Sequence, residues 1–201
     1  MLDTANTERR RGWTTTVLLG AAAIAVSIAA KSGATRNLDE QLRAQQPHPR
    51  RGPMRTASMR IRHAAKPEAP LLLSALLSTG LALGRVRGAE RIVGATFLAF
   101  MTDTLCKHVA PRERPSGYRG RKKRNQSFPS GHVTVNSAFA FSTARVLLRA
   151  GLVPSGPALA SAALVTAAIG ESRLVLDEHW PSDVLAGALI GTTAAWGATS
   201  W

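Results

Sequence analysis

The sequence contains one cysteine and few acidic residues among its 201 positions. The single cysteine, Cys106, excludes an intramolecular disulfide and any zinc site built from several cysteines. We interpret Cys106 as a small buried apolar residue. Only 12 Asp and Glu accompany 26 Lys and Arg, so the formal net charge is +14. This charge indicates an anionic partner: nucleic acid, a phosphorylated substrate or an anionic bilayer surface.

The sequence also lacks the apolar–polar alternation that is typical of β-strands, so it predicts an all-α fold. Its length leaves room for one soluble core or for about six membrane-spanning helices, but not for both. We therefore expect a single domain over residues 1–201. Within it we expect a polar N-terminal tail at 1–12, a basic loop at 31–68 and a motif-bearing core at 69–201.

Apolar blocks separated by basic loops fill most of the chain. Three uncharged blocks are 18 to 21 residues long, near the length needed to cross a bilayer: 13–30, 150–170 and 184–201. Three shorter or interrupted blocks are weaker candidates: 69–84, 92–106 and 133–148. We expect a polytopic membrane bundle of about six transmembrane helices. Because the mean hydropathy is only −0.02, a soluble helical protein is the alternative.

Two segments near the N-terminus allow two interpretations each. Three arginines at 9–11 followed by an apolar block are typical of a cleaved signal peptide or of a retained first helix, which we favour. In the basic loop, Leu38 and Leu42 share a face of a short helix expected at 37–46, which would lie at the membrane interface. The alternative, which we favour, is that the whole loop is a solvated connector.

Two further patterns concern packing and lipid. Gly187 and Gly191 form a face of small residues, which either lets the last helix approach a neighbour closely or arises by chance.

A basic run in the loop 112–126 would indicate a nucleic-acid patch in a soluble protein. Between two apolar blocks, contact with anionic lipid headgroups explains it better, so we expect a lipid bilayer as partner and no nucleic acid. The run comprises Arg119, Arg121, Lys122, Lys123 and Arg124.

Candidate phosphate ligands follow in the second half of the chain. Positioned cations that meet the charge on the oxygens of a transferring phosphoryl group lower the barrier strongly. Lys107, Arg114 and Arg173 are the candidates, although each taken singly is also explained as a snorkelling or interfacial residue. The motif 129–132, Pro-Ser-Gly-His, directly precedes an apolar block. We therefore expect the amides of its Ser and Gly at a helix N-terminus, where an anion is favoured.

A nucleophile and an acid complete this set. His179 and Asp183 are four positions apart, so in a helix the carboxylate reaches one ring nitrogen and leaves the other free to attack phosphorus. His132 would then protonate the leaving oxygen, because imidazole titrates near neutrality. Asp103 lies four positions before Lys107 on the same helical face and is a candidate for orienting that lysine. Either histidine alone would be explained as a satisfied interfacial residue.

Together the motifs resemble the signature of the type 2 phosphatidic acid phosphatase superfamily: Lys-x6-Arg-Pro, Pro-Ser-Gly-His and Ser-Arg-x5-His-x3-Asp. All eleven fixed positions occur in order and at the required spacing. The resemblance implies a helical phosphatase of the bacterial membrane lipid phosphatase branch, which uses no metal or other cofactor and forms a phosphohistidine. It also implies that His179 is the nucleophile, Asp183 its partner and His132 the acid. The implied phosphate cradle is Lys107, Arg114, Ser130, Gly131 and Arg173.

We therefore expect an enzyme that hydrolyses the terminal phosphate of a lipid phosphate or isoprenyl (pyro)phosphate in the bacterial plasma membrane. Two alternatives stay open: phosphoryl transfer to a lipid acceptor, and a non-catalytic basic membrane protein that binds anionic lipid.

Two signals disagree about the side of the membrane on which the site lies. Relatives of this type generally place the site outside the cytoplasm, whereas eighteen of the 26 cations lie on the catalytic side, which the positive-inside rule assigns to the cytoplasm. We expect an extracytoplasmic site.

Overall fold

The fold is all-α, as expected from the sequence. The computed structural model describes residues 2–49, 51–116, 118, 123 and 125–200, and these contain eight α-helices and no β-strand. The helices are α1 (Leu2–Ser32), α2 (Arg36–Gln45), α3 (Pro53–Ala64), α4 (Glu68–Leu83), α5 (Glu90–Val109), α6 (Gly131–Arg149), α7 (Ser155–Val175) and α8 (Pro181–Thr199). An isolated β-bridge pairs Arg112 with Gln126 in the loop between α5 and α6.

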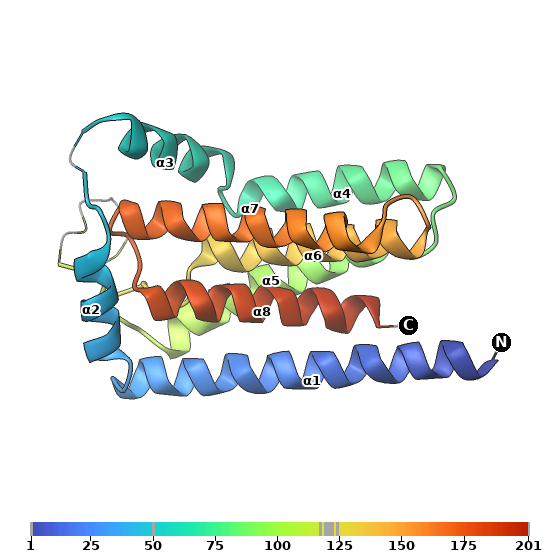
Figure 1. Ribbon diagram of the computed structural model, residues 1–201, viewed down its shortest axis with the longest axis horizontal. Coiled ribbons are helices and arrows are strands. Elements are labelled where there is room, and N and C mark those ends of the chain that lie inside the picture. The colour runs from blue at the N-terminus through green and yellow to red at the C-terminus, as the bar shows by residue number, and fades with distance from the viewer. Residues whose placement is uncertain (1, 50, 117, 119–122, 124, 201) are drawn as a thin grey trace.

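Six long helices run along the long axis of the molecule, and α2 lies across one end of the bundle (Figure 1). In the bundle α6 packs against α5, α7 and α8, whereas α1 packs on α8 and α3 on α7. The C-terminal ends of α5 and α7 and the N-terminal ends of α6 and α8 all lie at the α2 end (Figure 1). Each of the three sequence motifs therefore reaches the same end of the bundle.

The number of membrane-spanning helices is not confirmed. Among the described residues, two helical segments are long and apolar enough to cross a membrane, Arg9–Ser32 in α1 and Ser155–Val175 in α7. Helix α4 is apolar but has only 16 residues. The other long helices carry polar side chains into the bundle, such as Thr96, Ser137 and Thr199, which are completely buried and lower the hydropathy. About six spanning helices stay a prediction.

A close crossing of α6 and α8 confirms the packing role expected for the small residues of α8. A Cβ on Gly191 would lie 2.0 Å from Ser137 Oγ and 2.2 Å from the carbonyl oxygen of Thr134. A Cβ on Gly187 would lie 2.9 Å from the carbonyl oxygen of Ser130. The absence of side chains at these two positions lets the helix backbones approach. This approach fixes the start of α6 relative to the start of α8.

The basic loop at 31–68 is more ordered than the sequence indicated. It holds α2 and α3, and the expected interfacial helix is confirmed as a helix at Arg36–Gln45 with Leu38 and Leu42 exposed. The interpretation of the loop as a solvated connector is wrong, because two helices form there and Ser58 is buried against the bundle. Residues 2–12, expected as a polar tail, belong to α1. Of the basic run, Arg119, Arg121, Lys122 and Arg124 lie outside the described residues.

Candidate active site

His179 lies in the short connection between α7 and α8 and is almost completely buried. Its Nδ1 is 2.7 Å from the backbone oxygen of Ser127. Because a carbonyl oxygen can only accept, this contact places the ring proton on Nδ1 and leaves a lone pair on Nε2. Nε2 is 3.3 Å from Nη1 of Arg114. The nitrogen with the lone pair therefore faces a cation, which is the arrangement that attack on a bound phosphate requires.

Asp183 holds His179 less directly than the sequence suggested. Its Oδ2 is 3.7 Å from His179 Nδ1, beyond hydrogen-bond distance. The carboxylate instead accepts hydrogen bonds from Ser127 Oγ at 2.5 Å and from the Trp180 backbone N–H at 3.0 Å. Asp183 is the third residue of α8, so its side chain turns back to cap the helix N-terminus. The expected hydrogen bond between carboxylate and imidazole is replaced by one from the ring to the Ser127 carbonyl.

The environment keeps His179 neutral. Burial is the main reason that the pKa of His179 is lowered to about 4; the nearby Arg114 acts in the same direction, and Asp183 acts in the opposite one. An imidazole with this pKa is unprotonated at neutral pH, so its Nε2 lone pair is available for attack on phosphorus. Burial also lowers the pKa of Arg114, the cation nearest this nitrogen.

The predicted contact between Asp103 and Lys107 is present. Lys107 Nζ donates a hydrogen bond to Asp103 Oδ2 near the C-terminal end of α5. This ion pair lies against the first residue of α6, because a Cβ on Gly131 would be 2.7 Å from both Lys107 Nζ and Asp103 Oδ2. The lack of a side chain at Gly131 thus lets the first and second motifs meet.

The two arginines of the predicted cradle are buried, and Arg114 contacts His179. Arg114 is 3% exposed, and its guanidinium donates to the backbone oxygens of Glu178 at 2.5 Å and Gln126 at 2.9 Å. Arg173 is fully buried at the end of α7 and pairs with Glu178 Oε2 at 3.0 Å. Arg173 is therefore held by an acid adjacent to His179, a contact that the sequence analysis did not anticipate.

The second motif begins α6. Ser130 and His132 are both buried, and the Ser130 hydroxyl has no hydrogen-bond partner among the described residues. The backbone N–H of Ser130 donates to the backbone oxygen of Asp183 at 3.1 Å, which ties the second motif to the third. The helix N-terminus expected at this motif is confirmed, because α6 begins at Gly131, but the Ser130 amide is not free to bind an anion. At this helix N-terminus the Ser130 side chain caps no amide.

Three residues beside the motifs were missed. Arg112 Nη1 is 2.5 Å from Asp183 Oδ1, Ser127 contacts both His179 and Asp183, and Glu178 pairs with Arg173. Arg112 lies two positions before Arg114 in an extended segment, which could have indicated a shared side. No motif or periodicity marks Ser127 or Glu178.

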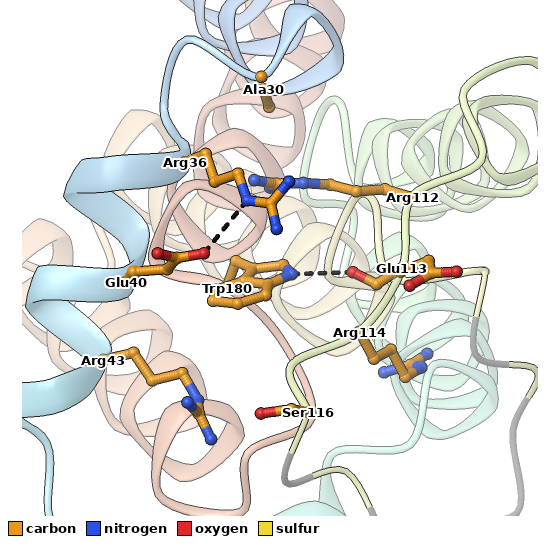
Figure 2. Close-up of a pocket in the computed structure, with 10 residues that line it drawn as sticks. Ala30, Arg36, Glu40, Arg43, Arg112, Glu113, Arg114, Ser116 and Trp180 are labelled. Carbon is orange, nitrogen blue, oxygen red and sulfur yellow. Dashed lines mark hydrogen bonds and ion pairs between the residues drawn. The ribbon is translucent and has the colours of Figure 1, made fainter.

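A cleft of about 680 Å³ opens beside this cluster, between the end of α1, α2, the segment 112–116 and Trp180. Figure 2 shows the indole of Trp180 in the cleft, with its Nε1 donating to the Glu113 backbone oxygen at 2.8 Å. Arg114 lines the cleft and also contacts His179, so a shared side chain connects the cleft to the predicted nucleophile. Among the described residues, no cluster of three His, Cys, Asp or Glu side chains is placed to hold a metal ion.

Comparison with known proteins identifies the family. A search of curated proteins finds no match. The fold resembles the crystal structure of a transmembrane PAP2-type phosphatidylglycerolphosphate phosphatase from Bacillus subtilis, with a TM-score of 0.73 and 22% identity over 91% of this chain and 93% of that one. It also resembles Aquifex aeolicus LpxE, with a TM-score of 0.58 and 22% identity over 76% of this chain and 89% of that one. The model of the PAP2 superfamily matches residues 72–201, which include all three motifs, and the chain therefore belongs to the PAP2 superfamily.

Proposed function

We propose that this protein is an integral membrane lipid phosphatase that hydrolyses a terminal phosphate from a lipid phosphate or isoprenyl (pyro)phosphate through a phosphohistidine. The observation that carries the proposal is the geometry of His179, whose Nδ1 contacts a carbonyl at 2.7 Å while Nε2 lies 3.3 Å from Arg114. Membership of the PAP2 superfamily supports phosphatase chemistry. The similar Bacillus subtilis protein, a phosphatidylglycerolphosphate phosphatase, supports a phosphorylated lipid as the substrate class.

In the first step, His179 Nε2 attacks phosphorus and the bond from phosphorus to the ester oxygen of the lipid breaks. Arg114, together with Lys107 and Arg173, meets the charge on the phosphoryl oxygens. His132 donates a proton to the leaving oxygen, so the lipid departs as an alcohol, or as a monophosphate when the substrate is a pyrophosphate. The Ser127 carbonyl and the carboxylate of Asp183 stabilise the positive charge that develops on the His179 ring.

In the second step, water attacks the phosphohistidine. His132, now neutral, takes a proton from this water, the bond from nitrogen to phosphorus breaks, and inorganic phosphate forms. The ring of His179 returns to the tautomer with its proton on Nδ1, which the Ser127 carbonyl favours. No external acid or base is consumed over the cycle.

The membrane setting is supported by the distribution of apolar side chains. Large apolar residues on the outside of the helices are strongly exposed, including Leu76 at 71% on α4, Leu105 at 62% on α5 and Leu164 at 70% on α7. Acyl chains would cover such surfaces. A substrate with its phosphate at the end of the bundle and its tail between or beside these helices fits this distribution.

The direct test measures phosphate release from a panel of lipid phosphates in detergent with excess chelator. We expect the wild type to release phosphate, and the His179→Ala and His132→Ala variants to lose at least about 100-fold in kcat. Acid-labile, base-stable labelling of the wild type by radioactive substrate, absent from His179→Ala, would report the phosphohistidine. Equal activity in all three proteins would refute the enzymatic proposal, and loss of activity on chelation would refute the metal-free mechanism.

We further propose that the catalytic end faces away from the cytoplasm of a bacterial cell. The test replaces Cys106 with Ala and introduces one cysteine at exposed Ser116, by the cleft, or at exposed Ser155, at the opposite end of the bundle. An impermeant thiol reagent added to intact cells should label the cysteine at 116 and spare the one at 155. The reverse labelling would refute this orientation.

A further inference from the structure

A further buried carboxylate lies behind the active site. Asp39, on α2, is 2% exposed although it belongs to a segment without any catalytic motif. Its Oδ1 accepts from the Ser182 backbone N–H at 2.9 Å, and its Oδ2 accepts from the Ser182 hydroxyl at 2.7 Å. Asp39 therefore binds the residue that directly precedes Asp183.

The guanidinium of Arg112 joins Asp39 to Asp183. Its Nη2 is 2.7 Å from Asp39 Oδ2, and its Nη1 is 2.5 Å from Asp183 Oδ1. The planar, permanently charged guanidinium can hold both carboxylates at once, which the ammonium of a lysine could not do with the same geometry. Figure 2 shows Arg112 beside Trp180, at the edge of the cleft, with α2 on the opposite side.

This arrangement has an electrostatic consequence. Two buried carboxylates near one another repel, and the Arg112 cation between them removes that repulsion. Asp39 also pairs with Arg112, so Arg112 neutralises the negative charge of Asp183 less completely than it would alone. The charge of Asp183 acts on His179 from 3.7 Å and favours the positive ring that forms during attack on phosphorus.

Helix α2 also holds the other side of the nucleophile. Arg43, one helical turn after Asp39, forms a two-bond ion pair with Asp177, with Nε at 2.6 Å and Nη2 at 2.7 Å from the carboxylate oxygens. Asp177 lies two residues before His179, whereas Ser182 lies three residues after it. Two adjacent turns of α2 therefore bind the chain on both sides of His179.

We propose that Asp39 and Arg43, both on α2, are positioning residues for the reaction. Asp39 acts through Arg112 on the charge of Asp183. Arg43 acts through Asp177 on the position of His179. This inference deepens the proposed function and rests on it. It assigns a catalytic purpose to the basic loop at 31–68, whose apolar side chains Leu38 and Leu42 are exposed. The alternative is that α2 only covers the end of the bundle.

The first test compares Asp39→Asn with Glu40→Gln. Both changes replace a carboxylate by its amide on neighbouring positions of α2, but the Glu40 side chain is 53% exposed and pairs with Arg36, which is still more exposed. We expect Asp39→Asn to lower kcat by about 10- to 100-fold with KM changed less than about threefold, because a small misplacement of catalytic groups affects the chemical step. Glu40→Gln should match the wild type. A kcat of Asp39→Asn within twofold of wild type would overturn the proposal.

The second test uses the pH dependence of kcat/KM. The charged groups that face His179 are Asp183, Arg114 and Glu178. Without the Asp39 charge, Arg112 neutralises Asp183 more fully, the pKa of His179 falls, and the acidic limb moves to lower pH. Arg112→Gln removes that neutralisation, so its limb should move to higher pH. A purely structural role does not predict that the acidic limb moves in opposite directions in the two variants. Movement of the limb in the same direction in both variants, or no movement in either, would overturn the proposal.

The third test addresses folding and the Arg43 contact. Arg43→Gln should lower kcat by about tenfold, and Arg43→Lys, which keeps the charge and one bond, should recover most of that loss. Equal loss in both variants together with a lower melting temperature would show that α2 acts only through stability, and would overturn the proposal. Wild type and His179→Ala are assayed alongside. An inactive wild type refutes the proposed function itself, whereas an active wild type with unaffected α2 variants refutes only this inference.

Discussion

The α6–α8 crossing allows a stability prediction to be worked from distances. In a Gly191→Ala variant the new methyl group would lie 2.2 Å from the Thr134 carbonyl oxygen and 3.0 Å from the Ala138 backbone nitrogen. These are main-chain atoms of α6, so the two helices must separate by about 1 Å to restore normal contact distances. Overpacking of this kind costs about 1–3 kcal/mol, against a gain of about 1 kcal/mol from the helix propensity of alanine.

The assay is thermal unfolding in detergent together with phosphate release. Because the clash is with main-chain atoms, we expect the upper end of the overpacking range, a net cost of about 2 kcal/mol. For a chain of this size that corresponds to a fall in Tm of roughly 4–8 °C, at roughly 2–4 °C for each kcal/mol. Asp183 lies two helical turns before Gly191 on α8, so we also expect kcat to fall by about tenfold or more as α8 shifts. Gly94→Ala is the matched control, because nothing lies within 4 Å of a Cβ built at Gly94 in α5.

Gly94→Ala should leave activity unchanged and leave Tm equal or slightly higher, because alanine favours the helix. The reasoning would be refuted if Gly191→Ala were as stable and as active as Gly94→Ala. That result would mean that α6 and α8 can separate without consequence for the site.

Three further predictions concern the site. Burial lowers the pKa of His179 to about 4. The rate of phosphohistidine formation should therefore stay high as pH falls through 6.5 and drop only near pH 4, where the ring gains a proton. Rapid-quench labelling across this pH range measures that rate. Arg114→Lys should lower kcat/KM by about 100-fold in steady-state assays, because a lysine cannot keep the bonds to two carbonyls and the phosphate. Ser127→Ala should lower kcat by only about tenfold, because it removes the hydroxyl bond to Asp183 and keeps the carbonyl at the ring; near-wild-type kcat would contradict the role given to that hydroxyl.

Much of the chemistry could be read from residue order alone. The pairing of Asp103 with Lys107 and the small residues on one face of α8 follow from helical periodicity, which is a local property of the chain. The helical relation expected between His179 and Asp183 does not hold, because His179 lies before the start of α8. The all-α fold followed from the absence of alternation and the length of the apolar blocks. Family membership followed from eleven residues in a fixed order.

The surroundings of those residues could not be read in this way. Whether Asp39 is solvated or buried depends on contacts with Ser182 and Arg112, which are 143 and 73 positions away. The hydrogen bond of His179 to a backbone carbonyl, and the use of the Ser130 amide by Asp183, leave no trace in side-chain patterns, because every residue offers the same main-chain groups. Block length alone does not fix the number of membrane spans, since buried polar side chains lower the hydropathy of the central helices.

By itself, therefore, the sequence determined the all-α fold class and the candidate residues of the site, because residue identity and spacing within each helix are local. Only the tertiary structure decided which atoms hold His179, and that α2 joins the site through Asp39 and Arg43. The reason is physical: burial, the direction of a hydrogen bond and the neighbours of a charge are set by helices packed together from distant parts of the chain.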